Sequence, residues 1–175
     1  SGIVWRSFDS GASWALATPI TGAPNVNGLT RCGDGISVFA VLACAENGHV
    51  YRTPNSGTLW IDATNAGTPL YAIAGWLLVV VAVGRSGKII RSDDGGSTWA
   101  AVTSPTATNL RGVVGSPTGR WTAVGDGGAI LQSLDNGVTW TVQTSPTTEN
   151  LRAVTRHVPS NRAIIVGDST TIILE

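Results

Sequence analysis

The side chains best suited to bind a charged partner are those of three arginines, Arg31, Arg111 and Arg152. The last two each follow an Asn-Leu pair, and Leu29 precedes the first by two positions. A guanidinium group donates paired hydrogen bonds to a carboxylate or a phosphate. If the three groups converge, they would bind an anion or an acidic peptide. The alternative is that each pairs with a carboxylate or a carbonyl group of the neighbouring repeat unit.

Two cysteines are expected on neighbouring strands of one hairpin. Cys32 and Cys44 come out nearly opposite and on the same face, so a disulfide is one interpretation and two free thiols are the other. A disulfide would contribute about 3 kcal/mol in the chain-entropy model and would indicate an oxidising compartment. Two cysteines are too few for a zinc site, and His49 and His157 lie far along the chain.

A Ser-x-Asp-x-Gly-x-Thr-Trp segment occurs four times, over residues 7–14, 53–60, 92–99 and 133–140, and we call each copy a box. The second copy diverges most, since Asn55 replaces Asp and Leu59 replaces Thr. The tryptophans recur at a period of roughly 40 residues, as in blades of four strands. The box residues are Ser7, Asp9, Gly11 and Trp14, then Asn55, Gly57 and Trp60, then Ser92, Asp94, Gly96 and Trp99, and finally Ser133, Asp135, Gly137 and Trp140.

The physics of the box favours a structural turn. Its Asp can accept hydrogen bonds from N–H groups of its own turn, and its Gly can adopt a positive φ. The Trp then opens the next strand and buries its ring between sheets, where about 200 Å² of buried surface contributes at most about 5 kcal/mol. Asp93-Asp94 also suggests a metal site, but Ca²⁺ takes about six to eight oxygen ligands and each box offers few. We therefore expect no metal and no cofactor.

Apolar runs with period-two alternation surround each box. In the last complete unit they predict strands A to D over residues 110–115, 120–125, 129–133 and 139–144. Strands A and B of a further unit are predicted over 151–158 and 162–167, followed by a C strand. The longest apolar run, residues 71–83, is shorter than the ~20 residues of a membrane-spanning helix. We interpret it as a buried strand and expect no membrane insertion.

The repeat predicts an all-β fold, a β-propeller of four-stranded antiparallel blades with the boxes at the C–D turns. A single domain over residues 1–175 would contain repeat units of about 1–27, 28–67, 68–108 and 109–149, with a partial unit over 150–175. This is one strand more than four complete blades need. We expect about four blades, as a closed small ring or as a segment of a larger propeller. The absence of Met also suggests a processed chain or a segment.

These repeats resemble those of the Asp-box, or BNR-type, β-propellers, and the resemblance covers the whole chain. The stretch GKIIRSDDGGSTW, residues 87–99, looks like a repeat of the photosystem II stability and assembly factor type. The resemblance implies that A strands line a central channel, where Arg31, Arg111 and Arg152 would meet an acidic partner segment. Sialidases, carbohydrate-binding proteins, assembly factors and phage tail proteins share the box, so it specifies architecture more than function.

The charge balance argues against two classes of function. Eleven basic and eleven acidic residues give zero net charge, which argues against nucleic-acid binding and against docking on anionic lipid. We expect a non-catalytic scaffold for protein–protein interaction, an assembly factor or a structural or virion component, with a protein or another propeller chain as partner. The alternative is a carbohydrate- or receptor-binding propeller of a secreted or phage tail protein. A glycan site would expose Trp5, Trp76 and Trp121.

A sialidase-like glycoside hydrolase is a third candidate. Such an enzyme needs arginines that grip a carboxylate, a Tyr nucleophile with a Glu partner, and an acid/base Asp. The sequence has two tyrosines, Tyr51 and Tyr71, and neither has an evident Glu partner. The sequence therefore predicts no enzymatic activity.

A second set of arginines, Arg6, Arg52 and Arg91, stands just before the first three boxes, and Gln132 takes that place before the fourth. Because strand C lies near the outer rim of a propeller, we expect a solvated or Asp-paired face, with a partner surface as the alternative. A single lysine and many Ser, Thr, Ala and Gly residues suit an extracellular, periplasmic or virion protein.

Overall fold

The computed structural model describes residues 2–22, 25–33, 38–157, 162–169 and 171–174. Seventeen strands within these residues form five antiparallel sheets. Three sheets have four strands each, whereas the first has two and the last has three. The predicted all-β architecture of four-stranded antiparallel blades is confirmed. We number the sheets blades 1 to 5 in chain order.

The strands alternate along the chain in simple up-and-down order. Blade 1 contains β1 (Trp5–Arg6) and β2 (Ala15–Leu16). Blade 2 contains β3 (Val26–Gly33), β4 (Val38–Ala45), β5 (His49–Thr53) and β6 (Ile61–Asn65). Blade 3 contains β7 (Leu70–Trp76), β8 (Val79–Gly84), β9 (Ile89–Ser92) and β10 (Ala100–Val102). Blade 4 contains β11 (Leu110–Gly115), β12 (Trp121–Gly125), β13 (Ile130–Ser133) and β14 (Thr141–Gln143). Blade 5 contains β15 (Leu151–His157), β16 (Arg162–Gly167) and β17 (Ile172–Leu174).

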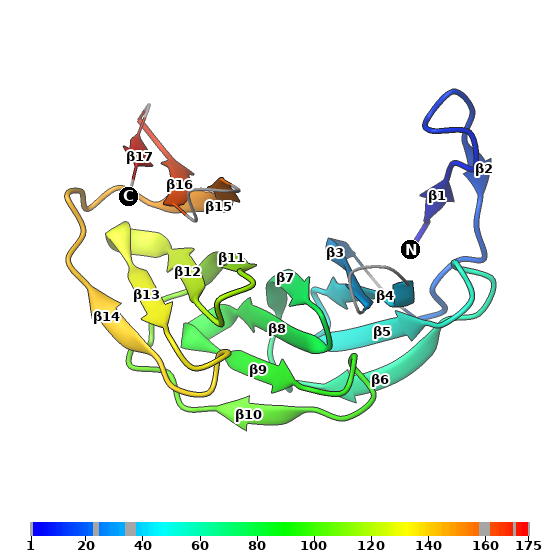
Figure 1. Ribbon diagram of the computed structural model, residues 1–175, viewed down its shortest axis with the longest axis horizontal. Coiled ribbons are helices and arrows are strands. Elements are labelled where there is room, and N and C mark those ends of the chain that lie inside the picture. Colours follow the sequence, from blue (N-terminus) through cyan, green and yellow to red (C-terminus); the bar gives the residue numbers. More distant parts are fainter. Residues whose placement is uncertain (1, 23–24, 34–37, 158–161, 170, 175) are drawn as a thin grey trace.

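The blades follow one another in an arc (Figure 1). The A strands β3, β7, β11 and β15 lie side by side on the inside, and the D strands β6, β10 and β14 lie on the outside. Blades 1 and 5 form the two ends, and the arc does not close across the described residues. Of the two arrangements left open by the sequence, the small closed ring is therefore wrong.

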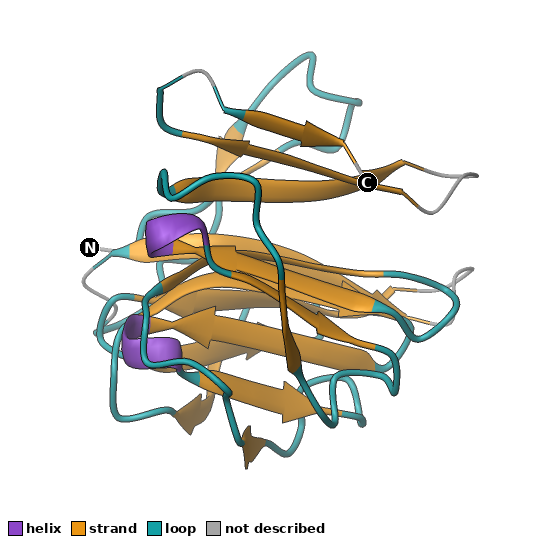
Figure 2. Ribbon diagram, turned by 90° about the vertical axis from the view of Figure 1, so that its left-hand side faces the viewer, coloured by secondary structure: helices purple, strands orange, loops and turns teal. Residues whose placement is uncertain are grey.

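Tight turns join the B and C strands. In blades 3 and 4 they are single 3₁₀ turns, η1 (Arg85–Gly87) and η2 (Asp126–Gly128), which lie on the same side of the molecule (Figure 2). A Cβ on Gly87 would lie 1.9 Å from the carbonyl oxygen of Thr106, so only glycine fits there. No helix in the described part of the chain is long and apolar enough to cross a membrane.

Residues 71–83, predicted as one buried strand, form a hairpin instead. Trp76, the last residue of β7, pairs with Val79, the first residue of β8. Leu77 and Leu78 make the two-residue turn, and Leu77 has a φ of 54°. Leucine rarely adopts this backbone conformation. The turn therefore lacks the Gly or Asn signal by which a hairpin is recognised in a sequence.

The hydrophobic core lies between the blades. Each buried cluster joins one face of a blade to the facing side of the next. Between blades 2 and 3 it contains Leu42, Cys44, Val50, Ile90 and Trp99, and between blades 3 and 4 it contains Val81, Val83, Trp121, Leu131 and Trp140. Adjacent blades are therefore held together by the same apolar surface that buries their strands.

Gly96→Ala tests how closely a box approaches the preceding blade. Gly96 has a φ of +81°, and a Cβ there would lie 2.1 Å from Cδ2 of Leu42. We expect the variant to lose about 2–3 kcal/mol of unfolding free energy, because left-handed backbone strain adds to overpacking of the core.

The matched control is Gly67→Ala, since Gly67 has a φ of +75° and its Cβ would meet no atom within 4 Å. This variant should lose only about 1 kcal/mol, the cost of backbone strain alone. Urea unfolding curves measure both losses, and equal losses would show that the contact with Leu42 costs nothing.

Candidate functional site

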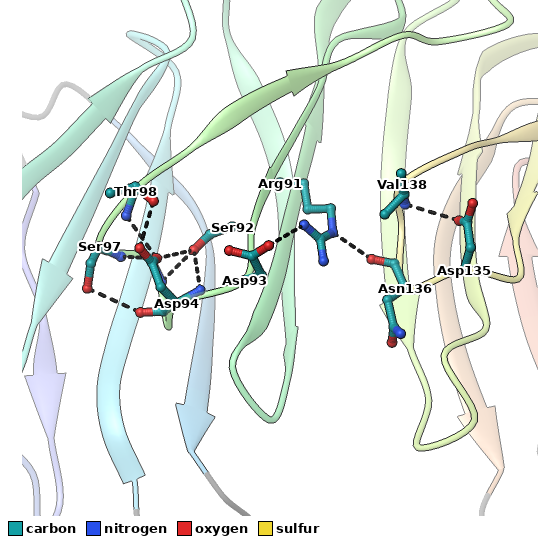
Figure 3. A network of polar contacts seen from close by, with 10 residues as sticks. Arg91, Ser92, Asp93, Asp94, Ser97, Thr98, Asp135, Asn136 and Val138 are labelled. Carbon is teal, nitrogen blue, oxygen red and sulfur yellow. Dashed lines mark hydrogen bonds and ion pairs between the residues drawn. The ribbon is translucent and has the colours of Figure 1, made fainter.

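Each complete box turn is held by its own aspartate (Figure 3). The Asp94 carboxylate accepts hydrogen bonds from the Ser92 hydroxyl at 2.8 Å and the Ser97 and Thr98 amides at 2.9 Å. The Thr98 hydroxyl adds a bond of 2.6 Å. Because the turn itself uses the carboxylate oxygens, the contacts support a structural role over a metal site. The described residues contain no cluster of three or more His, Cys, Asp or Glu side chains placed to hold a metal ion.

Burial of the box tryptophans depends on the preceding blade. Trp140 packs against blade 3 and is 7% exposed, whereas Trp14, in blade 1, is 62% exposed. Trp60 and Trp99 are half-buried. The expectation that every box tryptophan is buried between sheets is therefore wrong for Trp14, because no described sheet precedes blade 1.

The arginines before the boxes join neighbouring blades, a role that the prediction of a solvated or Asp-paired face did not include, although Arg91 does pair with Asp93. Arg52 Nε donates to the Gly95 carbonyl of the next box at 3.0 Å. Arg91 Nε donates to the Asn136 carbonyl at 2.7 Å, and its Nη1 also contacts Asp93 at 3.0 Å (Figure 3). Arg6 makes the corresponding contact with the Ser56 carbonyl at 3.0 Å. The acceptor carbonyl belongs in each case to the residue just before the box glycine. That residue has a positive φ, and its carbonyl points toward the preceding blade.

The two cysteines are free and buried, so the disulfide interpretation is wrong. The strand register places Cys32 opposite Ala40 and Cys44 opposite Gly28, at separate points along the hairpin. Burial raises the pKa of both thiols, that of Cys44 to about 12, so neither is poised as a nucleophile. The inference of an oxidising compartment loses the support that the disulfide would have given.

Arg111 and Arg152 occupy equivalent positions on the A strands, and Arg31 does not. Each A strand has a β-bulge that skips one residue in the pairing register, and in β11 and β15 the skipped residues are Arg111 and Arg152. In β3 the skipped residue is Asn27, and Arg31 lies farther along, opposite Val41. In β7 it is Tyr71. A bulge re-aims the side chain of the extra residue, so the three predicted arginines do not form one site.

Tyr71, Arg111 and Arg152 form what we call the bulge row, on three neighbouring A strands. Arg111 Cζ lies 4.6 Å from the centroid of the Tyr71 ring, a cation–π contact between blades 3 and 4. Nε and Nη2 of Arg111 both donate to the Asp126 carboxylate at 2.9 Å. Arg152 pairs in the same way with Asp168, at 2.8 and 2.6 Å. The pairing partners lie at the start of the B–C turns of the same blades.

Two asparagines that the sequence analysis missed connect the row to the blades before it. Asn109 Nδ2 donates to Asp126 at 2.9 Å, and its Oδ1 accepts from the Ser86 amide of blade 3 at 3.0 Å. Asn150 makes the equivalent bonds to Asp168 and to the Gly127 amide of blade 4. The signal was present as Asn-Leu-Arg followed by Gly-Asp in both units.

The three tryptophans proposed for glycan binding do not share an environment. Trp121 is fully buried in the core between blades 3 and 4. Trp5, on β1, is 58% exposed, and Trp76, at the end of β7, is 37% exposed. Trp121 therefore lacks the exposure that a glycan site needs. Trp5 and Trp76 have it, but they lie on different blades.

Acid should destabilise the fold through the boxes. Hydrogen bonds from the Thr139 hydroxyl and amide lower the pKa of Asp135 from 3.8 to about 2. The unfolded chain then binds more protons than the folded chain between about pH 4 and pH 2, so the stabilisation is present above this range and is lost as pH falls through it. Asp135→Asn, which keeps the acceptor that Asn55 provides in blade 2, should flatten the decline. Thermal unfolding across this pH range measures the decline in stability. An unchanged decline in the variant would contradict the assignment of the effect to Asp135.

A double-mutant cycle on Arg111→Ala and Asp126→Ala should give a coupling of about 1 kcal/mol, at the upper end for a surface pair because the contact is bidentate. The Arg152–Asp168 pair is the comparison. Its side chains are more exposed, 47% and 37% against 29% and 26%, so its coupling should be smaller. Urea unfolding of the two cycles measures the difference, and the reverse order would contradict this account.

No family model and no curated protein matches this sequence. Solved structures do share its fold. YCF48 bound to a D1 peptide is 18% identical with a TM-score of 0.72, over 99% of this chain and 56% of that one. The computationally designed Ika4 protein is 11% identical with a TM-score of 0.72, over 89% of this chain and 94% of that one. The GH74 enzyme of Niastella koreensis is 18% identical with a TM-score of 0.71, over all of this chain and 27% of that one. The chain thus spans little more than half of the YCF48 chain, and the likeness establishes the β-propeller fold.

Proposed function

We propose that this chain is a non-catalytic propeller that binds an extended segment of a partner protein along the bulge row. The observation that carries the proposal is the fixed orientation of Arg111 and Arg152 by Asp126 and Asp168 on adjacent A strands. Residues held rigidly before binding lose less conformational entropy when a partner arrives.

The row keeps hydrogen-bond donors for a partner. Each arginine uses Nε and Nη2 for its aspartate, and no interaction of Nη1 occurs among the described residues for either one. These N–H groups can donate to peptide carbonyls or to a terminal carboxylate. Because each arginine is already paired with an aspartate, recognition would rest on hydrogen-bond geometry and on the Tyr71 ring more than on net charge.

The comparison with YCF48 supports a peptide as the class of partner, since that propeller was solved with a D1 peptide bound. The geometry of the tyrosines supports a non-catalytic role. Tyr51 is 6% exposed and its hydroxyl accepts a hydrogen bond from Asn47 Nδ2 at 3.0 Å. Tyr71 lies beneath Arg111. Neither arrangement provides the tyrosine–glutamate pair of a sialidase-like hydrolase.

Panning a phage-displayed library of random peptides on the immobilised chain tests the proposal. Selected peptides should bind in fluorescence anisotropy, and Arg111→Lys/Arg152→Lys should weaken them about tenfold. Lysine keeps the charge and loses the forked geometry. Thermal unfolding confirms that the variant is folded.

The matched control is Arg162→Lys, since Arg162 is exposed at the far end of β16 from the row. It should leave affinity unchanged. Peptides that bind the double variant as tightly as the original chain would overturn the site. A chain that selects no peptide but retains glycans on an array would favour the carbohydrate alternative.

A further inference from the structure

The first residue after the B strand occupies an equivalent place in blades 2 to 5. In each of these blades its backbone amide donates a hydrogen bond of 2.9 Å to the carbonyl of the residue just before the A strand. We call this place the turn position, and the residues that occupy it are Glu46, Arg85, Asp126 and Asp168. Three of the four are acids, whereas blade 3 has a base.

The acids at the turn position bind polar groups at the start of the A strand of their own blade. Asp126 and Asp168 each hold a bulge-row arginine and an asparagine. Glu46 Oε2 accepts a hydrogen bond from Asn25 Nδ2. The turn position therefore supplies a carboxylate that the fold itself uses.

Blade 3 departs from this arrangement at both ends of the contact. Its turn position holds Arg85, and its bulge-row residue is Tyr71, whose ring packs with Arg111 of blade 4. The Arg85 side chain is exposed, and among the described residues its guanidinium makes neither a hydrogen bond nor an ion pair. Blade 3 therefore carries a positive charge here that the described part of the fold does not neutralise.

Hydrogen bonds hold the turn of Arg85 beside the bulge row. The amide of Ser86, the next residue, donates to Asn109 Oδ1 at 3.0 Å. Asn109 Nδ2 in turn donates at 2.9 Å to Asp126, the carboxylate that pairs with Arg111. Along the row, blades 4 and 5 thus present arginines that are already neutralised, and the blade 3 end presents a free cation. The row is electrostatically asymmetric from one end to the other.

We propose that Arg85 binds an acidic side chain, Asp or Glu, of the partner segment and so fixes the direction in which the segment runs along the bulge row. This inference rests on the proposed function and adds one charged contact to it. A guanidinium without an internal partner can donate paired hydrogen bonds to a carboxylate and breaks no ion pair in doing so. Over blades 4 and 5 the same carboxylate would lie beside Asp126 or Asp168, so repulsion disfavours the reversed direction.

Fluorescence anisotropy with the peptides selected by phage display tests this assignment. The peptides should share an acidic residue near one end. At low salt, Arg85→Gln should weaken their binding about fivefold, the upper range for an exposed ion pair. Replacing the acidic residue of the peptide by its amide should cost the same factor, and the two changes together should cost no more than either alone. Added salt should reduce the loss.

Two controls separate this contact from a general attraction between charges. Lys88→Gln removes the same charge next to the same turn, where the Lys88 amide donates to the Arg85 carbonyl at 3.1 Å, but it leaves the turn position intact. It should change affinity less than about twofold. A peptide with its acidic residue moved to the opposite end should bind more weakly than the original. Because the Arg85 side chain is exposed, thermal unfolding of Arg85→Gln should match that of the original chain.

The outcomes distinguish this inference from the proposed function. If Arg111→Lys/Arg152→Lys weakens the peptides and Arg85→Gln does not, the bulge row binds peptides and the role given to Arg85 is wrong. Equal losses from Arg85→Gln and Lys88→Gln would also overturn it, because they indicate attraction without a specific contact. A chain that binds no peptide contradicts the proposed function and, with it, this inference.

Discussion

Packing of one blade against the next is the constraint on which this structure depends. A single four-stranded sheet of this length has two apolar faces and cannot bury either of them alone. In each complete blade the box tryptophan and a C-strand side chain pack against the preceding blade, and B-strand side chains pack against the following blade. The low content of charged residues, 13%, is possible because stability comes from these repeated apolar contacts rather than from ion pairs.

Polar groups at the blade boundaries determine how the apolar faces meet. Arg52 and Arg91 each donate to a carbonyl of the next box, and Asn109 links a carboxylate of its own blade to an amide of the blade before. These contacts are directional, whereas apolar packing is not. They therefore fix the rotation between adjacent blades. The arginines involved are occupied within the fold, although the sequence left a partner-binding surface open for them.

The bulge row illustrates how a structural device can align side chains on neighbouring strands. The bulge places one extra residue at the start of each A strand, and the same position holds Asn27, Tyr71, Arg111 and Arg152 in successive blades. In blades 4 and 5 the following turn supplies an aspartate that orients the arginine. In blade 3 the aromatic ring replaces this ion pair and stacks with Arg111 instead. The row therefore presents partly exposed donors, held by ion pairs, on adjacent strands.

The sequence by itself determined the repeat, the strand order and the box turns, because these depend on local properties. A period of about 40 residues, alternating apolar positions and the Asp-x-Gly turn chemistry leave few alternatives to antiparallel blades. The A strand 110–115 and the B strand 162–167 agree with β11 and β16 residue for residue. The turn at Leu77 escaped prediction because its positive φ is imposed by pairing of the flanking strands rather than by a glycine.

The tertiary structure alone decided the strand register, the burial of side chains and the groups with which the arginines pair. The A–B hairpin of blade 2 is four residues longer than that of blade 4, because Gly28 pairs with Cys44 whereas Gly112 pairs with Val124. The alignment that brought Cys32 opposite Cys44, and grouped Arg31 with Arg111 and Arg152, was therefore four residues out of register along the A strand. Equivalent box tryptophans differ from 7% to 62% in exposure because burial is a property of the neighbouring blade, not of the residue. Whether an arginine faces solvent, an aspartate or the next blade depends on where the carbonyl of a distant turn points. Such relations arise only when the whole arc is assembled, since they join residues separated by a full repeat of the chain.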